Sequence, residues 1–150
     1  MTERKKALVT GGATGIGRSA VLALAKAGYD VAINYASSAK AAAATAKEAE
    51  ALGAKTLLVQ CDVSDEAGVR AMMKTVEAEF GHLDALINNA GTTASWKVKD
   101  LESLDLGEWD RTFAVNVRGT FQVTRAAVPL LKKGTNASIV NSASIVGLRP

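Results

Sequence analysis

A glycine-rich turn lies between the first short apolar segment of the chain and its first helical pattern. The turn, residues 11–17, follows the apolar residues 7–9 and leads into a helix predicted over residues 16–27. Glycines let the backbone turn tightly and approach a phosphate closely, and a helix amino terminus offers N–H groups and a positive dipole end to an anion. A strand, a glycine turn and a helix in this order predict a dinucleotide-binding unit rather than a turn without a ligand.

The alternation of short apolar segments and helical patterns continues along the chain. Further strands are predicted over residues 31–33, 56–59, 83–87 and 138–140. Further helices are predicted through the Ala-rich stretch to Leu52 and over residues 65–80 and 106–131. Ser37 or Ser38 can cap the first of these helices. Strands separated by helices favour right-handed crossovers and a parallel sheet. The predicted fold class is α/β: a doubly wound, Rossmann-like parallel sheet of five strands, order 3-2-1-4-5, in one dinucleotide-binding domain over residues 1–150.

Composition argues against several other classes of protein. The formal net charge is only +3, so we expect no nucleic-acid partner. Cys61 is the only cysteine, which excludes an internal disulfide and a paired-cysteine metal site, and we expect no bound metal. We interpret Cys61 as a buried apolar residue and His82, the only histidine, as a solvated polar residue. We see no secretory signal and no membrane-spanning run, so the expected location is the cytoplasm.

Five short motifs follow the predicted strands or lie in the last predicted helix. They are Thr10-Gly11-Gly12-Ala13-Thr14-Gly15-Ile16-Gly17 after the first strand, Asp62-Val63 after the third, Asn88-Asn89-Ala90-Gly91 after the fourth, Asn116 in the last helix, and Ser144-Ile145-Val146-Gly147 after the fifth strand. In content and order they resemble the motifs of the short-chain dehydrogenase/reductase family. The resemblance covers essentially the whole chain.

The resemblance implies an oxidoreductase that transfers a hydride between a nicotinamide cofactor and a small carbonyl or alcohol substrate. The cofactor-binding residues that it implies are Thr10, Gly11, Thr14, Gly15, Ile16, Gly17, Asp62, Val63, Asn89, Ala90 and Gly91. Asp62 would contact the adenine. Ser144 would orient the substrate carbonyl, and Asn116 would hold a water molecule in the proton relay. Ser142 resembles a catalytic serine only in type, and we interpret it as structural.

Hydride transfer to a ketone also needs a proton donor at the carbonyl oxygen. In the family this donor is the Tyr of a Tyr-x-x-x-Lys pair that follows the catalytic serine, and the pair would lie beyond Pro150. Tyr29 and Tyr35 are near the wrong strand to substitute for it. We therefore expect a domain truncated at its carboxyl terminus and inactive by itself. The alternative is a complete, non-catalytic dinucleotide-binding protein, such as a sensor.

The end of the second predicted strand bears on the choice between NAD and NADP. NAD-binding folds place an acidic residue there, about 20 residues after the glycines, to bind the ribose 2′-hydroxyl. Tyr35 stands at that position, and Ser37, Ser38 and Lys40 follow it with hydrogen-bond donors for a 2′-phosphate. Thr14 argues the other way, because many NADP-dependent relatives carry a basic residue there. We expect NADP(H) rather than NAD, with Tyr35, Ser37 and Ser38 at the cofactor.

Four large apolar residues recur at every fourth position of the last predicted helix. They are Trp109, Phe113, Val117 and Phe121. We interpret this stripe as facing the core. The resemblance implies that the corresponding helix takes part in subunit packing, so we expect the complete protein to form a homo-oligomer, a dimer or a tetramer. Residues 92–99 would form one wall of the substrate pocket, and their sequence does not specify a substrate class.

Overall fold

A five-stranded parallel sheet organises the chain. The strands are β1 (Lys5–Val9), β2 (Tyr29–Tyr35), β3 (Thr56–Gln60), β4 (Ala85–Asn88) and β5 (Ser138–Asn141). They lie in the order β3-β2-β1-β4-β5, which confirms the predicted fold class and topology. The computed structural model describes residues 4–93 and 100–144. Residues 145–147 of the last motif and residues 94–99 of the expected substrate wall lie outside this part of the chain.

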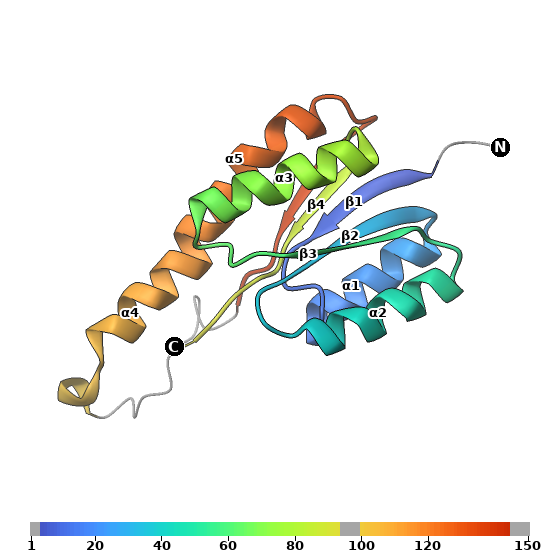
Figure 1. The fold of residues 1–150 in the computed structure, drawn as a ribbon. Coiled ribbons are helices and arrows are strands. Elements are labelled where there is room, and N and C mark those ends of the chain that lie inside the picture. Colours follow the sequence, from blue (N-terminus) through green and yellow to red (C-terminus); the bar gives the residue numbers. More distant parts are fainter. Residues whose placement is uncertain (1–3, 94–99, 145–150) are drawn as a thin grey trace.

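Helices cover both faces of the sheet (Figure 1). The helices α1 (Gly15–Lys26) and α2 (Ala39–Ala51) lie on one face. The opposite face is covered by α3 (Glu66–Phe80) and α5 (Thr120–Leu131). A short 3-10 helix, η1 (Leu101–Ser103), precedes the last helical segment. This three-layer arrangement is the doubly wound one that short strands alternating with helices predict.

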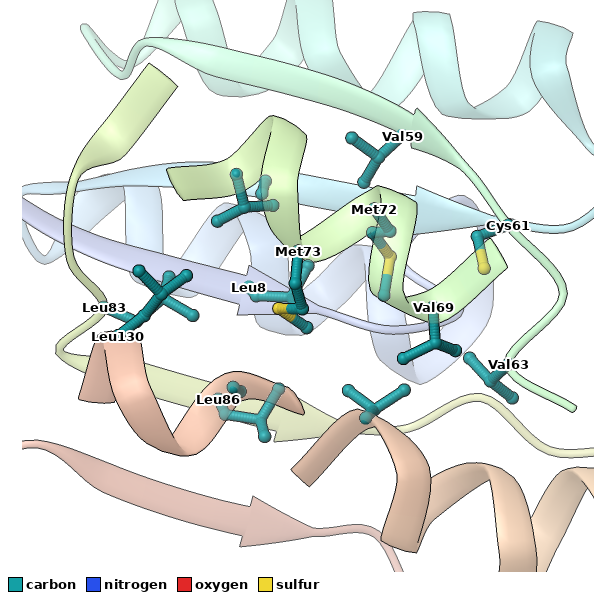
Figure 2. Packing of buried hydrophobic residues seen from close by; sticks show 14 of the residues in the cluster. Leu8, Val59, Cys61, Val63, Val69, Met72, Met73, Leu83, Leu86 and Leu130 are labelled. Carbon is teal, nitrogen blue, oxygen red and sulfur yellow. The ribbon is translucent and has the colours of Figure 1, made fainter. Parts of the chain in front are cut away.

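Successive residues of β1 pack into the two different layers of the core. Leu8 belongs to the apolar cluster beneath α3 and α5, whereas Val9 belongs to the cluster beneath α1 and α2. Figure 2 shows Met73 of α3 and Leu130 of α5 close to Leu8 and Leu86 of the sheet. Leu8 and Leu86 are fully buried, and burying one leucine side chain stabilises a fold by about 1.5–3 kcal/mol.

The last predicted helix is divided into three consecutive segments. They are α4 (Leu106–Phe113), a π-helical segment η2 (Ala114–Gly119) and α5. The prediction that the apolar stripe on this helix faces the core is wrong: the exposed fractions are 44% for Trp109, 50% for Phe113, 59% for Val117 and 60% for Phe121. For Trp109 and Phe113 the reason is that α4 extends beyond the sheet and has no layer to pack against (Figure 1). Val117 and Phe121 belong to η2 and α5, where other residues make the contacts with the core. Within η2, Val115 and Gly119 are the buried residues.

Two buried carboxylates connect segments at the amino ends of the strands. Lys6 joins them, because its Nζ lies 2.8 Å from Oδ2 of Asp30 and its backbone N–H donates to Oδ2 of Asp84 at 2.8 Å. Oδ1 of Asp84 accepts a hydrogen bond from the N–H of Thr135 at 2.8 Å. Nε2 of His82 lies 3.2 Å from the Asp84 carboxylate, so His82 is a partly buried partner of that group rather than a fully solvated residue.

These contacts determine the ionisation of Asp84. Burial by itself raises the pKa of this carboxyl group, but the backbone hydrogen bonds from Lys6 and Thr135, together with His82, lower the pKa below its ordinary value. Asp84 is therefore a charged, hydrogen-bonded group inside the fold at neutral pH.

Cys61 is buried, as predicted, with 7% of its surface exposed. Every helix within residues 4–93 and 100–144 is too short or too polar to cross a lipid bilayer.

Candidate functional site

The glycine-rich turn connects the carboxyl end of β1 to the amino end of α1. Gly11 and Gly15 have φ angles of +60° and +55°, which side-chain-bearing residues rarely adopt. A Cβ atom at Gly17 would lie 2.1 Å from the backbone oxygen of Gly11, so only glycine allows α1 to begin so close to the turn. Thr14 is at the N-cap position, its side chain makes no capping hydrogen bond, and Ile16 is exposed. The amino end of α1 is thus suited to an anionic ligand.

Thr10 and Asn89 hold this turn against the loop that follows β4. Oγ1 of the buried Thr10 accepts hydrogen bonds from the N–H groups of Asn89 at 2.9 Å and Ala90 at 3.0 Å. In return, Nδ2 of Asn89 donates to the backbone oxygens of Thr10 and Gly11, both at 3.2 Å. The first and third predicted motifs are therefore joined into one rigid unit.

Asn34, which was not predicted as a site residue, holds the same turn from the other side. Its side chain is buried, and its Oδ1 accepts from the N–H of Gly11 at 3.3 Å. Its Nδ2 donates to the backbone oxygens of Val59 at 3.3 Å and Cys61 at 2.9 Å. The one signal in the sequence is an amide residue at the end of an otherwise apolar strand. Such a side chain must find hydrogen-bond partners inside the protein.

The segment after β2 presents polar groups without an acidic residue. Tyr35 ends the strand and is partly buried, whereas Ser37 and Ser38 are exposed. Ser38 is at the N-cap position of α2, but its side chain makes no capping hydrogen bond, so the expected capping role of the serines is not seen at that position. The first turn of α2 contains no acidic residue, and Lys40 within it is exposed.

A cleft at the carboxyl ends of the strands brings most of these segments together. Its volume is about 290 Å³, and it is lined by Gly11, Asn34, Ala36, Ser37, Cys61, Asp62, Val63, Ala90, Gly91, Thr92, Arg111 and Val115. In open α/β sheets, ligands bind at this end of the strands. A larger groove of about 500 Å³ lies between α3 and α5, but none of the predicted site residues lines it.

Asp62 is an ionised acceptor at the edge of this cleft. Its Oδ1 accepts hydrogen bonds from the N–H of Ser64 at 2.9 Å and from Oγ of Ser64 at 2.7 Å. Its Oδ2 lies 2.8 Å from Nη1 of Arg111. Partial burial raises the pKa of Asp62, but Ser64 and Arg111 outweigh that effect and hold the pKa below its ordinary value. Asp62 therefore accepts hydrogen bonds and donates none at neutral pH.

Asn116 lies in η2 and pairs with the loop after β4. Its Oδ1 accepts from the N–H of Thr92 and its Nδ2 donates to the backbone oxygen of Thr92, both at 2.8 Å. The backbone oxygen of Asn116 accepts a hydrogen bond from Oγ1 of Thr120 at 2.9 Å. Both ends of the Asn116 carboxamide are thus engaged in fixing the loop beside Gly91.

Ser144 follows β5 at the same edge of the sheet and is exposed. Oγ of Ser142 donates to Oδ1 of Asn89 at 3.4 Å, in keeping with the structural role expected for Ser142. Upstream of both serines, Nδ2 of Asn88 donates to Oδ1 of Asn141 at 2.8 Å, which fixes the end of β5 against β4. One end of the sheet, where the strands have their carboxyl ends, therefore carries the candidate cofactor cleft, Asn116 and Ser144.

Comparisons with known proteins agree with this arrangement. The family model described as short chain dehydrogenase matches residues 5–150. The 3-oxoacyl-[acyl-carrier-protein] reductase FabG of Staphylococcus aureus is 40% identical over 147 residues, which is 98% of this chain and 58% of the relative. The chain thus spans little more than half the length of the curated relatives that it matches.

Two solved structures are similar over nearly the whole chain. A short chain dehydrogenase from Burkholderia cenocepacia in complex with NADP is 40% identical with a TM-score of 0.87, covering 97% of this chain and 57% of that one. A 3-ketoacyl-ACP reductase from Sinorhizobium meliloti is 37% identical with a TM-score of 0.88, covering 97% of this chain and 56% of that one.

Proposed function

This chain belongs to the short-chain dehydrogenase family, and from that membership we propose that its cleft binds NADP(H). We further propose that the whole protein transfers a hydride between NADP(H) and a small carbonyl or alcohol substrate. The observation that carries the proposal is one cleft lined by Gly11 of the glycine turn, Asp62 after β3 and Ala90 after β4. Bound NADPH would supply the hydride to a carbonyl substrate, and bound NADP+ would accept it from an alcohol.

The residues of the turn fit a pyrophosphate. With glycine at positions 11, 15 and 17, the backbone can approach the ligand closely, and the amino end of α1 faces it with a positive dipole end. We propose that Thr14 and Ile16 contact the cofactor through the same turn. Thr10 and Asn89 would act beneath it, by holding the turn at a fixed distance from the loop after β4.

The preference for NADP(H) over NAD(H) rests on the segment after β2. Tyr35 replaces the carboxylate that would bind a ribose 2′-hydroxyl, and the exposed Ser37 and Ser38 can donate hydrogen bonds to a 2′-phosphate. Lys40 adds a positive charge in the first turn of α2. A similar dehydrogenase, from Burkholderia cenocepacia, has been solved in complex with NADP, which supports the same choice here.

We propose that Ser144 donates a hydrogen bond to the substrate carbonyl oxygen and thereby orients it. Asn116 belongs to the same proposed catalytic set. Since its carboxamide pairs with the backbone of Thr92, we propose that it fixes the loop after β4, which would form one wall of the substrate site.

A proton donor is still required at the carbonyl oxygen. The two tyrosines of these 150 residues, Tyr29 and Tyr35, both lie in β2 and start no Tyr-x-x-x-Lys sequence. We propose that residues 1–150 together bind the cofactor but do not turn over substrate by themselves.

We also propose that the complete protein is a homo-oligomer. The support is the exposed apolar stripe of α4, η2 and α5, where the rings of Trp109 and Phe113 contact each other in a tilted arrangement with centroids 5.0 Å apart. An apolar surface of this kind is commonly covered by another polypeptide.

Cofactor titration tests the central proposal. Binding of NADPH and NADH is followed by nicotinamide fluorescence, first with the unaltered chain and then with Tyr35→Asp. We expect NADPH to bind more tightly than NADH, and Tyr35→Asp to shift the preference toward NADH, because the new carboxylate repels a 2′-phosphate. Equal affinities for the two cofactors in the unaltered chain would contradict the NADP(H) assignment. Absence of binding to either cofactor would contradict the proposed function itself.

A further inference from the structure

The loop that follows β3 is held in place by the helical segments α4, η2 and α5. Nε2 of the buried Gln122 donates to the backbone oxygen of Val63 at 2.9 Å. Gly119 packs directly against the same residue, since a Cβ atom there would lie 2.7 Å from Cγ2 of Val63. These contacts fix the backbone of the loop independently of its polar side chains.

Asp62 points away from the core that its neighbours occupy. Cys61 and Val63 are both buried in the cluster beneath α3 and α5, as Figure 2 shows. Asp62 lies between them, and its side chain is 38% exposed at the edge of the cleft. The hydrogen bond from the Gln122 side chain to the backbone of Val63 therefore helps to locate Asp62, whereas the orientation of the carboxylate depends on the groups that contact its two oxygens.

Arg111 of α4 and Ser64 together hold the carboxylate, Ser64 at Oδ1 and Arg111 at Oδ2. Nη1 of Arg111 lies 2.8 Å from Oδ2 of Asp62 and donates to Oγ of Ser64 at 2.8 Å. Ser64 in turn donates to Oδ1 of Asp62 through both its N–H and its hydroxyl. A guanidinium group has a fixed planar geometry, so the three side chains form a closed ring of contacts that defines the orientation of the carboxylate.

One acceptor position of Asp62 is left for a ligand. A carboxylate has about four lone-pair positions. Two on Oδ1 are used by Ser64, and one on Oδ2 is used by Arg111. The last position is on Oδ2, and both Asp62 and Arg111 line the cleft. An ionised acceptor of fixed orientation favours a ligand that brings an N–H donor and disfavours one that brings a carbonyl oxygen.

We propose that Arg111 is a positioning residue for adenine recognition. It orients the Asp62 carboxylate so that the free acceptor position on Oδ2 meets the exocyclic amino group of a 6-aminopurine and rejects a 6-oxopurine. This inference rests on the proposed cofactor function. It adds a residue on α4, far along the chain from the glycine turn, to the set that selects the nucleotide.

The test compares cofactors that differ only in the purine or only in the 2′-phosphate. Dissociation constants are measured by fluorescence for NADPH, NADH and the reduced hypoxanthine analogue of NADPH, in which a 6-oxo group replaces the 6-amino group. The variants are Arg111→Ala, Arg111→Lys and the control Arg70→Ala. Arg70 forms a similar exposed ion pair, with Glu66 at 2.7 Å on α3, outside the cleft.

We expect Arg111→Ala to weaken NADPH and NADH by about fivefold each and to leave the hypoxanthine analogue unchanged, because only the amino group uses the oriented carboxylate. Arg111→Lys should restore part of the loss, since it keeps the charge but not the planar geometry. Arg70→Ala should change none of the three constants. Arg111 is exposed, so these variants are expected to fold, and circular dichroism checks this.

Two outcomes would overturn the inference without affecting the proposed function. An equal loss for all three cofactors would assign Arg111 a general structural role. A loss confined to NADPH would assign it a direct contact with the 2′-phosphate, on the side of the cleft where Ser37 lies. If the unaltered protein bound none of the three cofactors, the proposed function would fail, and this inference would fail with it.

Discussion

The carboxamide of Asn116 pairs with both backbone groups of Thr92, with the N–H and the backbone oxygen each 2.8 Å from their side-chain partners. This pairing connects the π-helical segment η2 to the loop that follows β4. Among the described residues, the pairing of β4 with β5 ends at Asn88, and beyond it the Asn116 side chain supplies hydrogen bonds to the backbone of the loop. A change at position 116 is therefore expected to alter the geometry of the site more than the stability of the fold.

In the full-length protein, Asn116→Ala should lower kcat/KM by at least tenfold, because the loop loses both hydrogen bonds. The free energy of unfolding should fall by no more than about 1–2 kcal/mol, the net value of such bonds at an exposed site. Steady-state kinetics and urea denaturation measure the two effects. Thr112→Ala is the control, because the Thr112 hydroxyl donates to the backbone oxygen of Glu108 within α4. A variant with unchanged kinetics would remove Asn116 from the proposed site.

Gly15→Ala and Gly17→Ala separate two reasons for having glycine in the turn. At Gly17 a Cβ atom would overlap the backbone oxygen of Gly11, whereas at Gly15 it would meet no atom within 4 Å and the cost is the positive φ angle alone. Gly17→Ala should therefore abolish measurable NADPH binding. Gly15→Ala should cost about 1–2 kcal/mol of stability and leave weakened binding. Fluorescence titration and thermal unfolding distinguish the two. The opposite order of severity would contradict this reading of the turn.

Ser144→Ala should reduce turnover by about two orders of magnitude in the full-length protein, the scale of losing one preorganised donor at a carbonyl oxygen. The affinity for NADPH should stay within about twofold, because Ser144 is proposed to contact the substrate. Kinetics at saturating cofactor, with Ser142→Ala in parallel, test both statements. If Ser144→Ala lost NADPH affinity but kept its turnover at saturation, Ser144 would be assigned to the cofactor instead.

Asp84→Asn tests the buried network at the amino ends of the strands. The pKa of Asp84 is lowered in the folded state, so its contribution to stability is fully present above the unfolded value of about 3.9 and is lost as the pH falls through the folded pKa. At pH 7 the variant should lose about 1.5–3 kcal/mol of unfolding free energy, the value of a hydrogen bond to a charged group. The deficit should shrink below pH 4. Urea denaturation at pH 7 and below pH 4 measures the loss of unfolding free energy. Asp110→Asn, at an exposed aspartate, is the control. A deficit that is the same at both pH values would contradict the role of the charge.

The sheet order could be predicted from the sequence because the relevant signals are local. Short apolar segments, helical periodicity and the glycine turn are each contained in about 5–15 consecutive residues, and the rules for parallel crossovers supply the rest. The apolar stripe from Trp109 to Phe121 could not be placed in the same way. Periodicity identifies the residues that share one side of a helix, but not whether that side meets a sheet, and α4 runs past the sheet edge.

The contacts that organise the cleft are non-local, and this is why the sequence did not reveal them. Arg111 meets Ser64 across 47 positions of sequence, and Asn34 meets Cys61 across 27. Neither partner forms a motif with the other. By contrast, Asp62 and Asn89 could be named because each belongs to a short local motif, Asp62-Val63 or Asn88-Asn89-Ala90-Gly91, that resembles a motif of the short-chain dehydrogenase/reductase family.

Lys6 joins the two buried carboxylates, Asp30 and Asp84, at the amino ends of the strands, opposite the cleft. The groups that hold the strands in register and the groups proposed to bind ligands are therefore separated by the length of a strand. Substitutions in the loops at the carboxyl ends of the strands are therefore expected to leave the ion pairs at the amino ends intact. A library that randomises residues 36–38 and 92–93 while retaining Lys6, Asp30 and Asp84 should consequently yield mostly folded proteins of altered ligand preference. This sheet is then a usable scaffold for changing specificity.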